Sequence, residues 1–238
     1  MDDILLAGAM LLGACVQWLT GMGFALVAVP ALVLLLGPSD GVALANCASG
    51  VICLIGLVEG WRSVRVAAMV PLCAAAVCTV PAGTWLTRHL AEPVLLTAMG
   101  ALVTLAVLLV MCGARIRALR GTKGAVAAGA LGGMMNSAAG VGGPPMSLYA
   151  VNAGWLVQEF VPNAFFYGVV VNIFSVAAHG APQLATAQWG WSALALTVGM
   201  LVGRGLTGRL SEQRARWLVL GLAMAGGLTT LAKGAAGL

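Results

Sequence analysis

Ten apolar runs, separated by short polar or glycine-rich stretches, occupy most of the 238-residue chain. Hydrophobic residues make up 61% of the sequence and charged residues only 8%, whereas soluble domains average roughly 25% charged residues. The chain is therefore expected to be an all-α integral membrane protein with no soluble domain left over. The runs are residues 4–19, 24–36, 42–58, 66–88, 94–112, 123–139, 144–152, 162–180, 190–208 and 215–236.

Two of these runs, 24–36 and 144–152, are too short to cross a bilayer alone, because a full crossing takes about 20 residues. Each follows a glycine-rich stretch, GMG at 21–23 and GVGG at 140–143. Unpaired backbone is tolerated at membrane depth only where protein or a water-filled cavity surrounds it. We therefore predict that these glycines break the backbone inside the protein.

The two series of runs match piece by piece, which indicates an internal duplication. GMG at 21–23 aligns with GVG at 140–142, a separation of 119 residues. GTWLTRHL at 83–90 aligns with GRGLTGRL at 203–210, a separation of 120 residues. Two independent matches at nearly one separation favour a duplicated half over chance.

The basic loops determine the predicted topology, because cytoplasmic loops collect Lys and Arg. These loops are WRSVR (61–65), RIRALRGTK (115–123) and RLSEQRAR (209–216). If all three are cytoplasmic, residues 123–152 must return to the side on which they start. That segment is therefore predicted to be a hairpin of two short helices broken near GVGG, and the duplication predicts the same hairpin at 4–36.

We predict an all-α integral membrane fold of two inverted repeats, residues 1–118 and 119–238, which together form one membrane domain. Each repeat is a broken-helix hairpin followed by three transmembrane helices. An odd number of crossings inverts the second repeat relative to the first and leaves both termini outside. Inverted repeats with broken helices are typical of secondary transporters, whose substrate site lies near the midplane.

The second helix of each hairpin is predicted to begin at Phe24 and at Pro144, directly after the glycines. A helix N-terminus offers unpaired N–H groups and a partial positive charge, which together attract anions. Proline at the first helical position sacrifices no hydrogen bond, and glycine lets the backbone approach a ligand closely. Two such ends could hold a small anion without any buried Lys or Arg.

The candidate substrate-binding residues belong to the breaks or are uncharged polar residues of the neighbouring runs. Asn136 and Ser137 directly precede the second break, and Asn46 and Asn163 lie early in equivalent helices. For Asn172, hydrogen bonding between helices is an equal alternative. The full set is Gly21, Gly23, Asn46, Ser49, Asn136, Ser137, Gly140, Gly142, Gly143, Pro144, Asn163 and Asn172.

The seven acidic residues all fall in termini or predicted loops, which argues against a carboxylate proton relay at the midplane. Arg204 lies near the cytoplasmic end of its run and is expected to extend to the interface. His179 is expected to be a hydrogen-bonded interfacial histidine, with proton transfer as the alternative. The acids are Asp2, Asp3, Asp40, Glu59, Glu92, Glu159 and Glu212.

The six cysteines lie in apolar runs and form no CxxC motif, so they are expected to be packing residues. We expect no metal, no cofactor and no enzymatic activity. The net charge of +5 needs no nucleic-acid partner to explain it, because cytoplasmic loops of membrane proteins are basic.

Two glycine signatures resemble the sulfite exporter TauE/SafE family: TGMGFALVAVPAL (20–32) and GGMMNSAAGVGGPPMSLY (132–149). The later elements at Gly83 and Gly203 fit the same family. The resemblance covers essentially the whole chain. It implies a multi-pass permease of the bacterial inner membrane for small and often sulfur-containing anions such as sulfite, sulfonates or thiosulfate. In such a membrane the topology predicted from the basic loops makes both termini periplasmic.

The predicted function is thus secondary transport of a small anion bound at the midplane between two half-helix N-termini. A passive anion channel is the first alternative, and a membrane thiol-redox protein is the second. The expected partners are the anionic substrate, the lipid bilayer and, for a driven carrier, a coupling proton or cation. The coupling proton could also be carried on the substrate itself. The sequence predicts no oligomeric state.

Overall fold

A computed structural model describes residues 2–111, 121–207 and 212–237. These residues form ten α-helices and one 3₁₀ turn, and they contain no strand. In chain order the helices are α1 (Asp2–Thr20), α2 (Phe24–Leu36), α3 (Pro38–Gly60), η1 (Trp61–Ser63), α4 (Val66–His89), α5 (Glu92–Met111), α6 (Gly121–Ala139), α7 (Gly143–Asn152), α8 (Val157–His179), α9 (Thr186–Leu206) and α10 (Glu212–Ala236).

Each predicted apolar run corresponds to one helix, and the helix bounds follow the punctuation of the sequence. Gly37 adopts φ +84 between α2 and α3, and Pro38 starts α3, a position where proline lacks only an N–H that would be unpaired anyway. Gly180, with φ +89, ends α8, as glycine commonly does after a helix. The acidic residues of the described segments lie in first or last helical turns rather than in loops.

Five helices of the described residues are long and apolar enough to cross a membrane. This finding identifies the chain as a multi-pass membrane protein by length and composition. The candidate spans are Asp3–Thr20, Pro38–Ser63, Val66–His89, Glu92–Leu109 and Gln158–His179.

The two predicted hairpins are present, but their arms are unequal. The first arms, α1 and α6, have 19 residues each, or about 28 Å at 1.5 Å per residue. The second arms, α2 and α7, have 13 and 10 residues. The first arms are longer than the sequence suggested, because each glycine break ends a nearly full-length helix instead of dividing a span in the middle.

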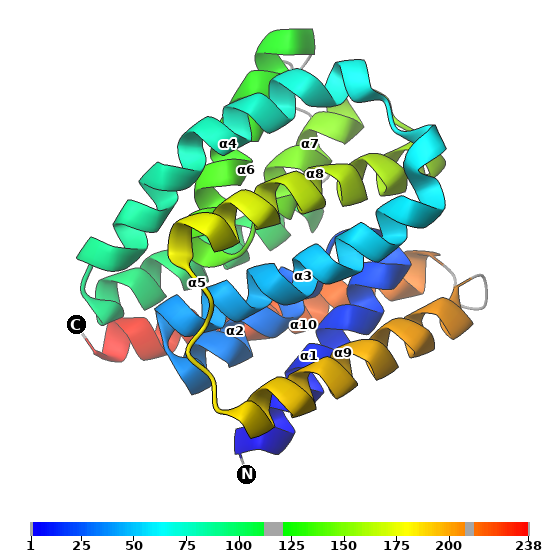
Figure 1. The fold of residues 1–238 in the computed structure, drawn as a ribbon. Helices are drawn as coiled ribbons and strands as arrows, with labels where there is room; N and C mark the ends of the chain where they lie inside the picture. Colours follow the sequence, from blue (N-terminus) through cyan, green and yellow to red (C-terminus); the bar gives the residue numbers. More distant parts are fainter. Residues whose placement is uncertain (1, 112–120, 208–211, 238) are drawn as a thin grey trace.

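Helix α6 runs parallel to α4 (Figure 1). Glycines of α6 let the two backbones come into contact. A Cβ added to Gly129 or Gly133 of α6 would meet the backbone of Leu72 or Ala76 of α4. Helix α1 lies parallel to α9 in a similar way. Close approach of this kind is typical of small residues at helix interfaces in membranes.

The helices give the molecule two distinct ends (Figure 1). The start of α4, with Arg65, and the end of α9, with Arg204, lie at one end, which we call the basic end. Helix α1 starts and α10 finishes at the opposite end, which we call the terminal end. Both ends of the α6–α7 hairpin lie toward the basic end, since α6 is parallel to α4 and Glu159 follows α7.

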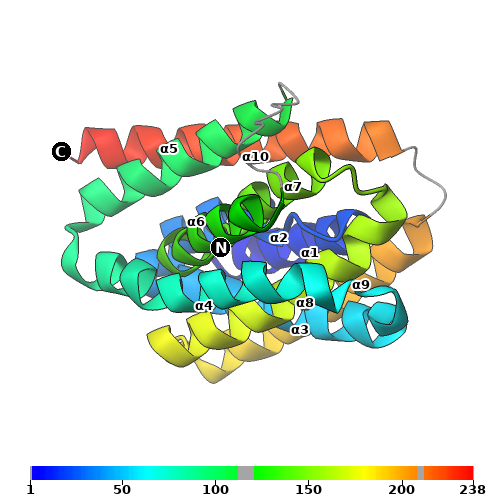
Figure 2. The same cartoon turned by 90° about the horizontal axis from the view of Figure 1, so that it is seen from above.

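Three apolar clusters occur among the described residues. The first combines buried residues of α1, α2, α3 and α9, the start of α5, and Ala139 at the end of α6. The second combines buried residues of α4, α6, α7 and α8. The third is smaller and joins α5 and α10 to Val141 of the second break. Helices α5 and α10 run antiparallel along one face, at the top of Figure 2. The two hairpins lie between this pair and the other long helices.

Candidate functional site

The first break joins α1 to α2. Gly21 has φ +75, and its N–H donates to the carbonyl of Gln17 at 2.8 Å. Gly23 has φ +155 and directly precedes α2. Both torsions lie in a region that L side chains rarely adopt, so glycine is required at these two positions. The hydroxyl of Thr20 donates to backbone carbonyls of the same turn, at Val16 and Met22.

The second break joins α6 to α7. Like the first break, it begins with a glycine of positive φ directly after the preceding helix. Gly140 has φ +68, and its N–H donates to the carbonyl of Asn136 at 2.7 Å. The N–H of Gly142 then donates to the Asn136 side chain, Oδ1, at 3.2 Å. Asn136 therefore fixes both glycines of the second break, one through its backbone and one through its amide.

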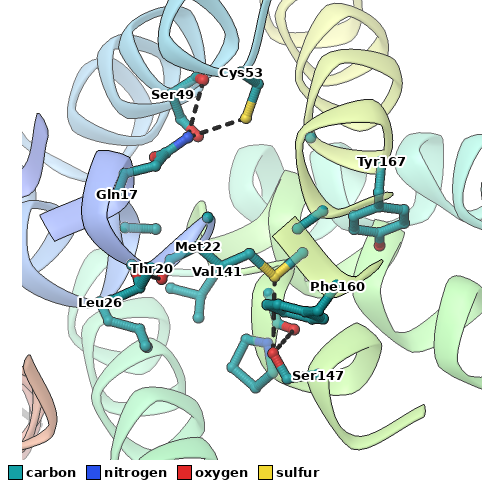
Figure 3. Close-up of a pocket in the computed structure, with 18 of the residues that line it drawn as sticks. Gln17, Thr20, Met22, Leu26, Ser49, Cys53, Val141, Ser147, Phe160 and Tyr167 are labelled. Carbon is teal, nitrogen blue, oxygen red and sulfur yellow. Dashed lines mark hydrogen bonds between the residues drawn. The ribbon is translucent and has the colours of Figure 1, made fainter. Parts of the chain in front are cut away.

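The two breaks face each other. A Cβ added to Gly143, at the start of α7, would lie 3.2 Å from Sδ of Met22 in the first break. The Ser147 hydroxyl of α7 lies 3.8 Å from the same sulfur and donates to the Gly143 carbonyl at 3.0 Å (Figure 3). The starts of the two short helices, predicted from sequence to share a site, are thus in contact.

A cavity of about 710 Å³ lies at this junction. Its polar lining residues include Gln17, Ser49, Asn136 and Asn172, and its apolar and aromatic lining residues include Leu26, Val161, Phe160 and Trp155. None of the described residues that line the cavity has a charged side chain. A ligand held here would be bound by neutral donors and helix ends.

An amide cluster forms the floor of the cavity on the α6 side. The Nδ2 group of Asn136 lies 3.0 Å from Oδ1 of Asn46, 3.1 Å from Oδ1 of Asn172 and 3.1 Å from Oγ of Ser175. Nδ2 of Asn172 donates in turn to the Ser49 hydroxyl at 3.1 Å. Since Nδ2 carries two hydrogens, the three acceptors share them, and the cluster holds Asn136 in one orientation.

Gln17 is the counterpart of Asn136 in the first half, 119 residues earlier. Its Nε2 donates to the Ser49 carbonyl at 3.2 Å and to Sγ of Cys53 at 3.0 Å (Figure 3). Cys53 and Asn172 are also separated by 119 residues. Sequence reasoning missed Gln17 as a candidate, although extending the GMG–GVG alignment four residues toward the N-terminus would have found it.

Nine of the twelve predicted site residues line the cavity. They are Gly21, Gly23, Ser49, Asn136, Gly140, Gly142, Gly143, Pro144 and Asn172. Asn46 lies behind Asn136 and reaches the cavity only through it. The Ser137 hydroxyl instead lies 2.6 Å from that of Thr84 in α4.

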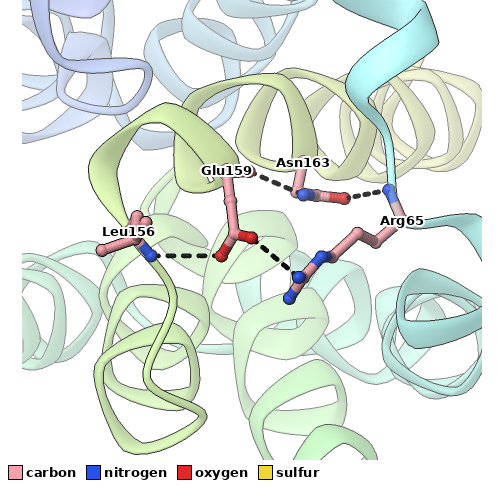
Figure 4. Close-up of polar contacts among 4 residues, drawn as sticks. All are labelled: Arg65, Leu156, Glu159 and Asn163. Atoms are coloured by element: carbon pink, nitrogen blue, oxygen red, sulfur yellow. Dashed lines mark hydrogen bonds and ion pairs between the residues drawn. The ribbon is translucent and has the colours of Figure 1, made fainter.

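Asn163 lies away from the cavity, at the basic end, in a cluster that joins α4 to α8 (Figure 4). Its Oδ1 accepts the N–H of Arg65 at 2.9 Å, and its Nδ2 donates to the Glu159 carbonyl at 2.6 Å. Glu159 also pairs with the Arg65 guanidinium at 2.7 Å and accepts the N–H of Leu156 at 3.2 Å. These structural hydrogen bonds account for a polar residue at position 163, so no ligand is needed to explain it.

The two short helices present different donors to the cavity. Helix α2 follows Gly23 with no side-chain cap, so the first-turn N–H groups of Ala25 and Leu26 have no intrahelical acceptor. Helix α7 begins at Gly143, one residue before the predicted start, and continues with Pro144 and Pro145. Proline has no N–H, so the first turn of α7 offers chiefly the Gly143 N–H.

Tyr167 is a further lining residue that the sequence analysis did not select as a candidate. Its ring is buried against α6, where a Cβ added to Gly132 would meet the hydroxyl. Within the described part of the chain, this hydroxyl and Nδ2 of Asn46 are buried without a hydrogen-bond partner. A buried donor left unsatisfied costs about 1–3 kcal/mol, so the hydroxyl of the lining residue Tyr167 is a candidate partner for a polar ligand or for water.

Arg204 and His179 lie outside the cavity lining. Arg204 pairs with Glu59 at 2.9 Å, and its guanidinium lies over the Trp18 ring, with an exposed side chain. Nδ1 of His179 lies 3.2 Å from the Ser175 carbonyl and 3.5 Å from the Thr84 hydroxyl. Nε2 of His179 is buried without a hydrogen-bond partner among the described residues, and the interfacial role of both residues stays a prediction.

No group of His, Cys, Asp and Glu that could hold a metal occurs among residues 2–111, 121–207 and 212–237. The cysteines of these segments are free thiols. Cys112 lies outside the described residues, as do residues 115–120 and 209–211 of the predicted basic loops.

Comparison with protein-family models matches residues 5–230 to one family, described as sulfite exporter TauE/SafE. Neither the curated proteins nor the solved structures provide a match. The matched range contains both glycine breaks, the amide cluster and all residues that line the cavity. The chain therefore belongs to the sulfite exporter TauE/SafE family, a family of membrane transporters.

Proposed function

We propose that the protein is a secondary transporter that moves a small, sulfur-containing anion, such as sulfite, a sulfonate or thiosulfate. The observation that carries the proposal is the cavity of about 710 Å³ between the facing starts of α2 and α7. Glycines at both breaks bring the backbone to the cavity surface, and the helix ends supply N–H donors and partial positive charge.

The neutral lining favours a monoanion over a dianion. A helix N-terminus stabilises an anion by about 0.3–2 kcal/mol, while the desolvation cost of a buried ion is several kcal/mol and increases steeply with its charge. A singly charged species such as bisulfite or a sulfonate therefore fits this site better than a doubly charged one. If the substrate is bisulfite, the proton that it carries would then serve as the coupling ion, whereas a sulfonate carries no such proton.

We further propose that residues 1–118 and 119–238 are inverted repeats. Supporting contacts recur at separations of 119 and 120 residues. A Cβ added to Gly83 would meet Met134 and Ser137 of α6, and one added to Gly203 would meet Cys15 and Trp18 of α1. The hydroxyls of Thr87 and Thr207 each donate to the carbonyl of the glycine four residues earlier.

The repeats and the basic loops support a topology with cytoplasmic loops at the basic end and periplasmic termini in the inner membrane. Single cysteines at Arg62 and Gly237, which lie at opposite ends of the molecule, test it. We expect a membrane-impermeant maleimide to label Gly237→Cys in intact cells and Arg62→Cys only in opened cells. Labelling of both from one side would contradict the inverted topology.

Counterflow into proteoliposomes tests the transport proposal. Vesicles loaded with unlabelled sulfite should take up labelled sulfite transiently, with saturable rates, and methanesulfonate should compete better than sulfate. Non-saturable flux without counterflow would indicate the passive channel instead. A variant without cysteines that keeps transport would exclude the thiol-redox alternative.

A further inference from the structure

We propose that the units that move during transport are not the two sequence halves. They are two groups of four helices, here called bodies, and each body includes one helix from the other sequence half. The first body is α1, α2, α3 and α9, and the second body is α4, α6, α7 and α8. Each contains the first three helices of one half and the fourth helix of the other half. The inference rests on the proposed transport function and adds to it which helices stay together.

Backbone contact attaches α9 to α1. A Cβ added to Gly199 would lie 2.8 Å from the Ala14 Cβ. One added to Gly203 would lie 2.8 Å from the Cys15 carbonyl oxygen and 3.0 Å from the Trp18 Cβ. Packing this close leaves no room for the two helices to slide past each other.

Hydrogen bonds and glycine contacts attach α4 to α6. The Thr79 hydroxyl donates to the Ala130 carbonyl at 2.8 Å, and the Thr87 hydroxyl lies 3.3 Å from the Ala138 carbonyl. These bonds leave the donor's own helix and join a helix of the other half. Separating α4 from α6 in a bilayer would break all of them with no water to replace them.

Polar contacts at both ends connect each long central helix to the exchanged helix of its body. Helix α8 is bound to α4 through Arg65 and Glu159 at the basic end. At the terminal end, the Arg88 guanidinium donates to the Ala178 carbonyl at 2.8 Å.

Helix α3 is joined to α9 at both ends as well. Arg204 and Glu59 pair at the basic end. Oδ1 of Asp40 accepts the N–H of Gln183, in the segment before α9, at 3.0 Å at the terminal end. The two larger apolar clusters follow the same division except for Ala139 of α6 and the start of α5, which pack in the first cluster.

The bodies meet along α3 and α8 through small and polar residues and through the Phe165 ring, which a Cβ added to Gly56 would meet. A Cβ added to Gly50 would lie 3.3 Å from Cβ of Asn172, and one added to Gly168 would meet Sγ of Cys53. The amide cluster and the cavity lie in the same contact. The contact is close along its whole length, so the proposed motion is a tilt of one body about this line rather than a slide along it, with exchange of the polar contacts on either side.

Spin-label distances test which units move, independently of any flux assay. Leu12 and Trp85 are exposed residues in the same sequence half but in different bodies, whereas Val126 and Trp85 are exposed residues in different halves of one body. Adding sulfite should change the distance between labels at Leu12→Cys and Trp85→Cys by several Å. The distance between labels at Val126→Cys and Trp85→Cys should stay constant.

Disulfide cross-links provide the functional counterpart, with the reduced form of each variant as its own control. Cβ atoms at Gly60 and Pro162 would lie 3.5 Å apart across the two bodies, at the edge of the ~3.5–4.5 Å range of a disulfide. Oxidising Gly60→Cys/Pro162→Cys should stop counterflow, and reduction should restore it. The control pair is Trp18→Cys/Gly203→Cys within the first body, whose Cβ atoms would lie 3.0 Å apart and need a shift of about 0.5 Å to reach disulfide geometry. Its oxidation should leave counterflow close to the reduced rate.

The proposal would be overturned by the opposite pattern, which would show that the sequence halves move. In that pattern only the Val126–Trp85 distance changes, and only the Trp18–Gly203 cross-link stops counterflow. Constant distances for both label pairs would overturn it too. A third outcome separates the two proposals. If no reduced variant shows counterflow but the Leu12–Trp85 distance still changes, the proposed transport function is wrong, while the proposed division into two bodies is supported.

Discussion

The two glycine breaks occupy equivalent places, yet they are built differently. The first has two glycines with positive φ, and Gln17 next to it bonds to Ser49 and Cys53 of α3. The second has one such glycine, and Asn136 bonds both to the following backbone and to three other side chains. The first break thus depends on backbone torsion and the second on a side-chain network.

The helices that follow the breaks differ in the same sense. Helix α2 presents unpaired N–H groups to the cavity, whereas Pro144 and Pro145 remove two donors from α7. The proposed substrate therefore obtains most of its N–H donors from the first half. The second half contributes a wall whose shape is fixed by Asn136.

The largest effect is expected for Gly142→Leu. A Cβ at this position would lie 2.8 Å from the Asn136 Cβ and 3.0 Å from the Gly132 carbonyl oxygen. Transport should be abolished, while expression and the gel-filtration profile stay largely intact. Gly190→Leu is the matched control, because a Cβ there meets nothing within 4 Å. Full activity of Gly142→Leu would mean that the second break is only a structural kink.

The amide residues should separate the two breaks next. Asn136→Leu removes the network that holds Gly142, and we expect transport to fall by about tenfold or more, since each lost hydrogen bond costs about 1 kcal/mol. Gln17→Leu loses two weaker contacts and should fall only a few-fold. Initial uptake rates, normalised to folded protein, measure both. If both variants lose the same fraction of transport, the proposed difference between the two breaks is wrong.

The helix starts should respond in opposite directions to changes in donor number. Pro144→Ala with Pro145→Ala adds N–H groups to α7 and should lower the half-saturating sulfite concentration a few-fold. Ala25→Pro removes a first-turn donor from α2, where proline is still tolerated, and should raise it. If neither change alters the half-saturating sulfite concentration, the helix starts do not contact the anion.

The smallest effects are expected for the acids. Glu59→Gln and Glu159→Gln each remove one partner of a partly exposed ion pair, which is worth about 0–1 kcal/mol. Transport should stay within a few-fold of wild type from acid to neutral pH, in uptake assays on folded protein. Selective loss of pH-dependent transport in either variant would identify that acid as a proton relay.

The sequence predicted the helices well because hydropathy and glycine spacing report directly on membrane spans. Residues 24–36 coincide with α2, and the glycines of both breaks line the cavity. It did not reveal the packing of α4 on α6 or of α9 on α1, because hydropathy contains no information on which apolar faces meet. Tyr167 was missed for a similar reason, since only the fold brings its hydroxyl to Gly132.

The partnership of α1 with α9 has a consequence for the synthesis of the protein. Leu11 and Gly199 are 188 residues apart in the chain, so α1 waits roughly 10–40 s for its partner at a translation rate of about 5–20 residues per second. Leu72 and Gly129 are only 57 residues apart, and α4 and α6 can join soon after they enter the bilayer. The second body can therefore assemble while the N-terminal helices still lack α9, and those helices are the part of the nascent chain most exposed to quality control.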